Sequence, residues 1–255
     1  KGFRWLGKNV KQINYNGDKL TPETLKYQLK CYLATRRIIE ERQLDFISIK
    51  CHYELSEHYV TQCVNCVLCS DPYDWRGKKE PTVFACEADS DGALTMQILK
   101  LISGLPTLFI DLRHYDEKEG VYVFCNCGAQ STWFAERSEN HVDNLKKVTL
   151  YPVIPKYKAK GAHLQYQCKE GEITFARLGR DGKGQYEMAI LRGEFVEFPM
   201  EKLRETCWEW PHAYAKIDIP PDKLIDVWPA NHFHAVSGNY IAELMKICEI
   251  LKIKP

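Results

Sequence analysis

The chain contains 255 residues, of which 45% are hydrophobic and 27% are charged, and its net charge is +1. This balance is typical of a globular protein with a real core. The small net charge argues against a general nucleic-acid or membrane-surface binder, because such proteins use a strong basic excess. No apolar run approaches the roughly 18–20 residues that a membrane span needs. We therefore expect neither a nucleic acid nor a membrane as partner.

The first residues of the chain predict that an N-terminal part is missing, and the cysteines predict a cytoplasmic location. The first residue is Lys1 rather than Met, and residues 1–20 have the pattern of a strand or loop that continues something already under way. We therefore expect a fragment that lacks an N-terminal domain. The 11 cysteines are an odd number, and several lie in apolar runs. With no recognisable signal peptide, this pattern favours reduced, buried thiols in a cytoplasmic protein.

The first part of the chain alternates between helix and strand patterns. Thr21, Pro22 and Glu23 form a helix start, which predicts a helix to about Arg42. The further predicted elements are strand 46–49, helix 60–69, strand 82–86, a helix from 89 or 90 to Gly104, and strand 108–110. Strands separated by helices predict a doubly wound parallel α/β sheet, a Rossmann-like domain over residues 1–115. Ligands bind at the carboxyl edge of such sheets, just past the strand ends.

After about residue 115 the pattern becomes one of short strands separated by turns. The predicted strands are 121–124, 148–154, 164–168, 173–178, 186–191 and 195–198. They predict an antiparallel β-barrel-like domain over residues 116–255. A helix from Ser237, with apolar residues at helical spacing, closes this domain.

The segment 86–92 is the densest group of candidate functional residues. Asp89 and Asp91 suit capping of the following helix and its dipole. Glu87 differs from them because it directly ends an apolar run, where a carboxylate is costly unless it is paired. A divalent cation would provide such a pairing.

Two further segments carry candidate ligands. Asp111 also follows an apolar strand, and Arg113 and His114 come next; an Asp–Arg ion pair or a loop cap would explain this segment equally well. His232 and His234 precede the last helix, either as ordinary loop histidines or as metal ligands. A set of Glu, Asp and His provides the oxygen and nitrogen donors that suit Mn²⁺ or a similar ion.

The cysteine-rich segment 63–69 suggests a different kind of site. Cys63, Cys66 and Cys69 recur at steps of three, which a zinc or iron–sulfur site could use. The apolar residues between them favour a packed helix instead. Cys125 and Cys127, with Asn126 between them, directly follow the predicted strand 121–124 and are a weaker signal for such a site.

Three segments together resemble the L-fucose isomerase/L-arabinose isomerase superfamily. They are Cys86-Glu-Ala-Asp-Ser-Asp-Gly-Ala-Leu-Thr-Met96, Phe109-Ile-Asp-Leu-Arg113 and His232-Phe-His-Ala-Val236. Residues 49–55 and the cysteine-bearing helix that follows look like the L-fucose isomerase-like branch. The resemblance implies that the chain holds most of a second α/β domain and a third, barrel-like domain.

The resemblance also implies a ligand set. The family holds Mn²⁺ with Glu, Asp and His, which correspond here to Glu87, Asp111 and His234, while His232 two residues away is the alternative. Arg113, His114 and His232 are then expected to contact the sugar. The arabinose isomerases use a further ligating His where this chain has 124–127, so the three-ligand, fucose-type site is favoured. A homo-oligomer, a trimer or hexamer, is implied as well.

The implied activity is that of a metal-dependent aldose–ketose isomerase. A proton would move between C1 and C2 of an open-chain monosaccharide through an enediol, with Glu87 and Asp111 as ligands and as the acid/base pair. A catalytically silent sugar-binding or assembly protein on the same scaffold is the alternative. A cysteine-ligated metal module is a third hypothesis.

Overall fold

The computed structural model describes residues 1–51, 53–128, 130–154 and 158–255. Its helices are α1 (Gly2–Asn9), α2 (Pro22–Arg42), α3 (Glu54–His58), α4 (Cys63–Ser70), α5 (Ser90–Ser103), α6 (His141–Leu145), α7 (Pro221–Val227) and α8 (Ile241–Leu251). Its longer strands are β2 (Phe46–Ile49), β5 (Val83–Cys86), β6 (Leu108–Asp116), β7 (Val121–Cys125), β8 (Thr149–Pro152), β9 (Ala162–Gln165), β10 (Gly171–Arg180), β11 (Tyr186–Val196), β12 (His212–Ile217) and β13 (His232–Ser237). Three two-residue strands complete the set: β1 (Gln12–Ile13), β3 (Tyr73–Asp74) and β4 (Gly77–Lys78).

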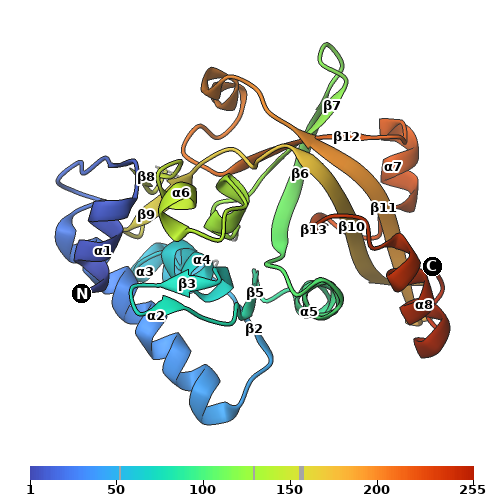
Figure 1. The fold of residues 1–255 in the computed structure, drawn as a ribbon, viewed down its shortest axis with the longest axis horizontal. Helices are drawn as coiled ribbons and strands as arrows, with labels where there is room; N and C mark the ends of the chain where they lie inside the picture. Colours follow the sequence, from blue (N-terminus) through green and yellow to red (C-terminus); the bar gives the residue numbers. More distant parts are fainter. Residues whose placement is uncertain (52, 129, 155–157) are drawn as a thin grey trace.

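The second part of the chain is dominated by an antiparallel sheet of six strands. They pair in the order β10-β11-β12-β7-β6-β13, and β13 pairs back to β10, so the hydrogen-bonded ladder closes on itself. Helix α8 lies against the outer side of this sheet beside β11, at the right of Figure 1. The prediction of an antiparallel, strand-rich second part with a C-terminal helix is confirmed in this form.

The predicted parallel sheet is smaller than expected. Strands β2 and β5 pair in parallel, with Phe46 opposite Val83. The third predicted strand, 108–110, is instead the start of β6, which pairs with β7 and β13. The prediction of a three-stranded parallel sheet is therefore wrong at this strand. A short apolar run has the same pattern in either kind of sheet, and only its hydrogen-bonding partners distinguish the two.

Several other predicted elements differ from the structure. Residues 2–9 form a helix that buries Leu6, not a strand or loop. Strands β8 and β9 belong to a separate sheet with β1. The segments 186–191 and 195–198 lie largely in one strand, β11. The chain continues through Gly193 without a turn, because Gly193 pairs with Ile173 on β10 and with Ile217 on β12. A Cβ at this position would come within 2.9 Å of the ring of Phe175. Strands β12 and β13 were not predicted.

The local helix signals are confirmed. Thr21 caps α2 in a capping box with Thr24, and Gly104 ends α5 in the left-handed conformation. Helix α5 lies between the parallel pair β2–β5 and the closed sheet. It contacts β5 and β2 on one side and β10 and β13 on the other (Figure 1). No helix in the described part is long and apolar enough to cross a membrane.

Aromatic side chains fill the interior of the closed sheet. The ring centroid of Phe124 lies 5.6 Å from that of Phe175 and 5.1 Å from that of Phe233, and all three residues are at most 2% exposed. Such rings bury large apolar areas and attract one another in tilted arrangements. The strands that carry the site described below are therefore fixed by a rigid core.

We predict that Phe124→Ala lowers the free energy of unfolding by about 3–5 kcal/mol, because it removes a buried ring and leaves a cavity. Leu101→Ala on the exposed face of α5, where Leu101 is 71% exposed, should change it by less than about 0.5 kcal/mol. Denaturant unfolding of the two variants measures the difference, and similar losses in both would contradict this account of the core.

Candidate active site

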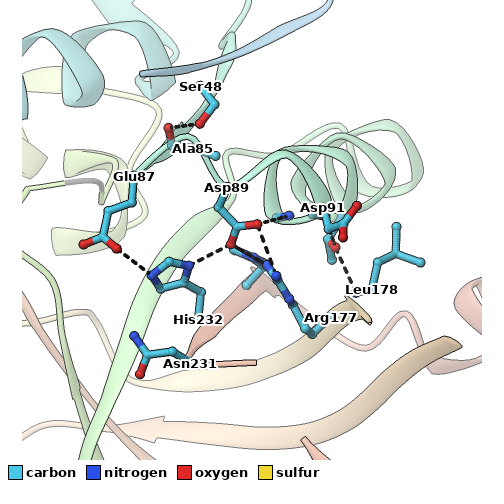
Figure 2. A network of polar contacts seen from close by, with 12 residues as sticks. Ser48, Ala85, Glu87, Asp89, Asp91, Arg177, Leu178, Asn231 and His232 are labelled. Carbon is cyan, nitrogen blue, oxygen red and sulfur yellow. Dashed lines mark hydrogen bonds and ion pairs between the residues drawn. The ribbon is translucent and has the colours of Figure 1, made fainter. Parts of the chain in front are cut away.

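Glu87 lies in a strained turn between β5 and α5. Glu87 and Ala88 both have positive φ angles, 59° and 58°. Left-handed backbone costs a non-glycine residue about 1–3 kcal/mol and is common at functional sites, where surrounding structure imposes it. The turn reverses the chain so that Asp89 becomes the N-cap of α5. It also directs the Glu87 carboxylate toward His232 (Figure 2).

Asp111 reaches the same place from the closed sheet. It lies within β6 rather than just past a strand end, so the predicted position at a parallel-sheet edge is wrong. Its register partner on β13 is His232, which puts both side chains on the same side of the sheet. One carboxylate oxygen accepts a hydrogen bond from Asn126 Nδ2 (2.9 Å) and the other from Asn231 Nδ2 (3.2 Å).

The imidazole of His232 lies between three carboxylates. Its Nε2 is 3.4 Å from Glu87 Oε2 and 3.4 Å from Asp111 Oδ1, while its Nδ1 is 2.7 Å from Asp89 Oδ2. The ring packs on Phe109, with centroids 4.3 Å apart. Figure 2 shows Glu87 and Asp89 approaching the ring from opposite sides. The loop, the helix terminus and two strands thus meet at one side chain.

Asp89 forms an ion pair with the buried side chain of Arg177. Arg177 on β10 contacts both carboxylate oxygens, at 2.5 Å from NH1 to Oδ2 and 3.1 Å from NH2 to Oδ1. The same NH1 lies 2.9 Å from Nε2 of His234, which is fully buried. A Cβ on Gly92 would come within 2.6 Å of Asp89 Oδ2 and 2.7 Å of His234 Nε2, so this helix position requires glycine.

The electrostatic environment differs sharply among these groups. Burial raises the pKa of Asp111 to about 6. Burial would lower the pKa of His232, but hydrogen bonds to Asp89 and Glu87 raise it to about 9. Burial alone would raise the pKa of Asp89, yet hydrogen bonds from His232 and Arg177 hold it well below its usual value. Burial, and then the charge of Arg177, lower the pKa of His234 far below its usual range.

The structure brings His232, and not His234, to the two carboxylates that the sequence singled out. His234 follows two residues later on β13, opposite Phe109, which is about 7 Å along the strand. Its Nε2 is engaged by Arg177. The sequence could not separate the two histidines because they point to the same side of one strand.

The other predicted sugar contacts, Arg113 and His114, lie on β6, after Asp111. Arg113 donates from Nε to the sulfur of Cys125 at 3.1 Å and lies over the ring of Trp210, with its Cζ 5.1 Å from the ring centroid. Its charge is near enough to lower the pKa of Asp111 against the effect of burial. His114 follows a bulge in β6 and lines an open groove with residues 115–119, 198, 199, 201, 202 and 205.

The cysteine segment forms the packed helix that its apolar residues favoured. Every residue of α4 is buried, and Cys66 and Cys69 donate to Phe84 O and Asn65 Oδ1. Across residues 1–51, 53–128, 130–154 and 158–255, no group of three or more His, Cys, Asp or Glu side chains is arranged so that it could hold a metal ion as it stands. At the carboxylate site, Nε2 of His232 lies 3.4 Å from one oxygen of Glu87 and 3.4 Å from one oxygen of Asp111.

Three residues of the site were missed by sequence reasoning. Asn126 was noted only as the residue between Cys125 and Cys127, and Asn231, next to His232, was not singled out, because an amide has no distinctive spacing. Arg177 did carry a signal. It is a single cation inside the apolar run 173–178, and such a residue is buried only when it is paired.

Comparison with known proteins identifies the family of the chain. Residues 124–255, more than half of the chain, match the model of the L-fucose isomerase C-terminal domain. The chain therefore belongs to this family of sugar isomerases, and the resemblance inferred from its motifs is confirmed. His232 and Arg177 lie inside the matched range, whereas Glu87 and Asp111 precede it.

Curated relatives give a more particular likeness. A sulfoquinovose isomerase of Clostridium sp. (strain MSTE9) is 27% identical over 171 residues, 67% of this chain and 36% of the relative. Those of Alkalicoccus urumqiensis and Priestia aryabhattai are 27% and 22% identical, over 65% and 98% of this chain and 34% and 52% of the relatives. The chain thus spans about a third to a half of the length of these relatives.

We predict that Arg177→Met lowers the free energy of unfolding by about 3–5 kcal/mol, because it leaves the carboxylate of Asp89 buried without its cation. The side chains of this pair are only 9% and 10% exposed. Arg180→Met is the matched control: its partner is Asp91 on the same helix, but Arg180 is 50% exposed, so the loss should stay below about 1 kcal/mol. Equal losses in the two variants, measured by denaturant unfolding, would contradict the assigned role of burial.

Proposed function

We propose that this chain carries the metal-binding catalytic site of an aldose–ketose isomerase. The observation that supports it most directly is the convergence of Glu87, Asp111 and His232 from a loop and two strands. Membership of the L-fucose isomerase C-terminal family gives the reaction class. The names of the relatives give a sugar as the substrate class.

The side chains present suit a hard divalent cation such as Mn²⁺. Two carboxylate oxygens and one imidazole nitrogen form the donor set that such ions prefer. Neighbouring ligands of a six-coordinate ion with bonds of about 2.0–2.1 Å stand about 3 Å apart. The nitrogen of His232 already lies 3.4 Å from each oxygen. We therefore propose Glu87, Asp111 and His232 as the ligands, in place of the set with His234.

The proposed reaction moves a proton between C1 and C2 of an open-chain monosaccharide. A bound divalent cation supplies Lewis acidity at the sugar oxygens, which makes the carbon next to the carbonyl more acidic. A carboxylate oxygen of Glu87 or Asp111 takes the proton from one carbon and returns it to the other, while the hydroxyl proton on the neighbouring oxygen moves to the former carbonyl oxygen. Asn126 and Asn231 hold the Asp111 carboxylate in place while this happens. Arg113, beside Asp111, is proposed to contact a sugar hydroxyl.

The remaining properties are proposed from the family. The chain covers only part of its relatives, so turnover belongs to a full-length protein in which an N-terminal domain completes the sugar pocket. A cytoplasmic homo-oligomer, a trimer or hexamer, is expected for it. Candidate substrates are L-fucose, D-arabinose, L-arabinose and sulfoquinovose.

We predict that Glu87→Gln in the full-length protein reduces turnover by at least about a hundredfold, because the amide removes both a ligand charge and a possible base. The measurement is ketose formation from each candidate aldose with added Mn²⁺. Circular dichroism should show an unchanged fold, since Glu87 is 40% exposed. Full activity of this variant would refute the proposal. Sugar binding without any ketose in the unmodified protein would indicate a silent sugar-binding protein instead.

We predict that the two histidines differ in Mn²⁺ binding. His232→Gln should weaken binding of Mn²⁺ by at least about tenfold, because it removes the nitrogen that faces both carboxylates. His234→Gln should lower stability, since His234 is fully buried against Arg177, but change Mn²⁺ affinity much less. Isothermal titration of each full-length variant with Mn²⁺ measures this. The reverse order of effects would restore His234 as the ligand.

A further inference from the structure

We infer that Asp89 is a positioning residue, which orients His232 and selects its tautomer, and that Arg177 anchors Asp89 for this purpose. This inference rests on the proposed function, in which His232 is a metal ligand. It adds an element that neither the family match nor the names of the relatives assign. The sequence had given Asp89 only the part of a helix cap.

The contact between Asp89 and His232 determines which ring nitrogen carries the proton. Oδ2 of the ionised carboxylate can only accept, and it lies 2.7 Å from Nδ1 of His232. Nδ1 therefore carries a hydrogen. In the neutral ring, the lone pair is then on Nε2, the nitrogen that faces Glu87 and Asp111. A carboxylate on the far nitrogen is the arrangement that orients many metal-bound histidines.

The carboxylate of Asp89 is held on both oxygens. Oδ1 accepts from the backbone N–H of Gly92 (2.8 Å) and from NH2 of Arg177 (3.1 Å), while Oδ2 accepts from NH1 of Arg177 (2.5 Å). Two contacts to one planar guanidinium fix the plane of the carboxylate as well as its position. His232 therefore meets an acceptor that cannot turn away (Figure 2).

His234 also belongs to this series of contacts, because it accepts a hydrogen bond from Arg177. Arg177 NH1 is a donor only, so Nε2 of His234, 2.9 Å away, must accept from it as a neutral ring. This contact holds the same nitrogen, NH1, that donates to Oδ2 of Asp89. The order of contacts is thus His234, Arg177, Asp89 and His232.

Helix capping alone does not explain the side chain of Asp89. The cap uses only Oδ1, through the N–H of Gly92. A serine or asparagine would cap as well, yet Oδ2 is committed to His232 and Arg177. Asp91 provides the comparison: it is the second residue of the same helix, and its carboxylate pairs with Arg180 and Tyr186.

The test is the Mn²⁺ affinity of Asp89→Asn in the full-length protein, measured by isothermal titration. Asparagine has nearly the same shape, and its amide oxygen, in the place of Oδ1, can keep the contacts to Gly92 and to NH2 of Arg177. Its NH₂ group then takes the place of Oδ2, so the hydrogen bond from NH1 of Arg177 is lost and Nδ1 of His232 faces a donor. The ring hydrogen therefore shifts to Nε2, which removes the lone pair that would bind the ion. We expect Mn²⁺ binding to weaken by about 10–100-fold. Asp91→Asn should leave it unchanged.

Two further readouts separate positioning from a general loss of structure. Asp89→Ser keeps a good cap but no carboxylate, and should weaken Mn²⁺ binding as Asp89→Asn does. At saturating Mn²⁺, the KM for the sugar in Asp89→Asn should stay near that of the unmodified protein, while the Mn²⁺ concentration needed for half-maximal activity rises. Arg177→Lys should recover part of the affinity that Arg177→Met loses, because a cation is restored.

The outcomes distinguish this inference from the proposed function. If Glu87→Gln loses Mn²⁺ binding while folded Asp89→Asn and Asp89→Ser bind Mn²⁺ like the unmodified protein, the positioning role is refuted and the metal site stands. If Glu87→Gln also binds Mn²⁺ normally, the ion is not held at this site and both proposals fall.

Discussion

The pairing of β6 with β13 is the constraint on which the rest of the site depends. Its register sets Asp111 opposite His232, so a carboxylate and an imidazole that lie 121 positions apart in the chain share one side of one sheet. Because side chains alternate along a strand, a slip of one residue would turn His232 to the other side and bring Phe233 toward the carboxylates. The aromatic interior around Phe124, Phe175 and Phe233 makes such a slip costly.

Helix α5 and the turn before it position the other two carboxylates of the site, those of Glu87 and Asp89. This helix lies between the two sheets, and the strained turn before it carries Glu87 toward the closed sheet. The same helix terminus presents Asp89 to His232 on one side and to Arg177 on the other. Burying this much charge is tolerable because each carboxylate is met by a cation or by amide donors. The site is therefore also an electrostatic contact between the start of α5 and the closed sheet, beside the ion pair of Asp91 and Arg180.

The family match and the site do not coincide in sequence. The matched range 124–255 contains His232, Arg177 and the two asparagines, while all of the carboxylates precede it. The closed sheet explains this division, since β6 belongs to it in space although it lies before the matched range. A site assembled across such a boundary needs both segments, which is consistent with the match of the Priestia aryabhattai relative over 98% of the chain.

The sequence by itself determined the local features of this protein. The caps of α2 and α5, the strand–helix alternation of residues 46–104, the two acidic candidates Glu87 and Asp111 and the family all followed from neighbouring residues, because capping, periodicity and motifs are short-range properties. Only the tertiary structure decided the sheet to which 108–116 belongs, which histidine meets the carboxylates, and the role of Arg177. These depend on strand register and on contacts between side chains such as Asp89 and Arg177, 88 positions apart, and nothing in a local pattern specifies them.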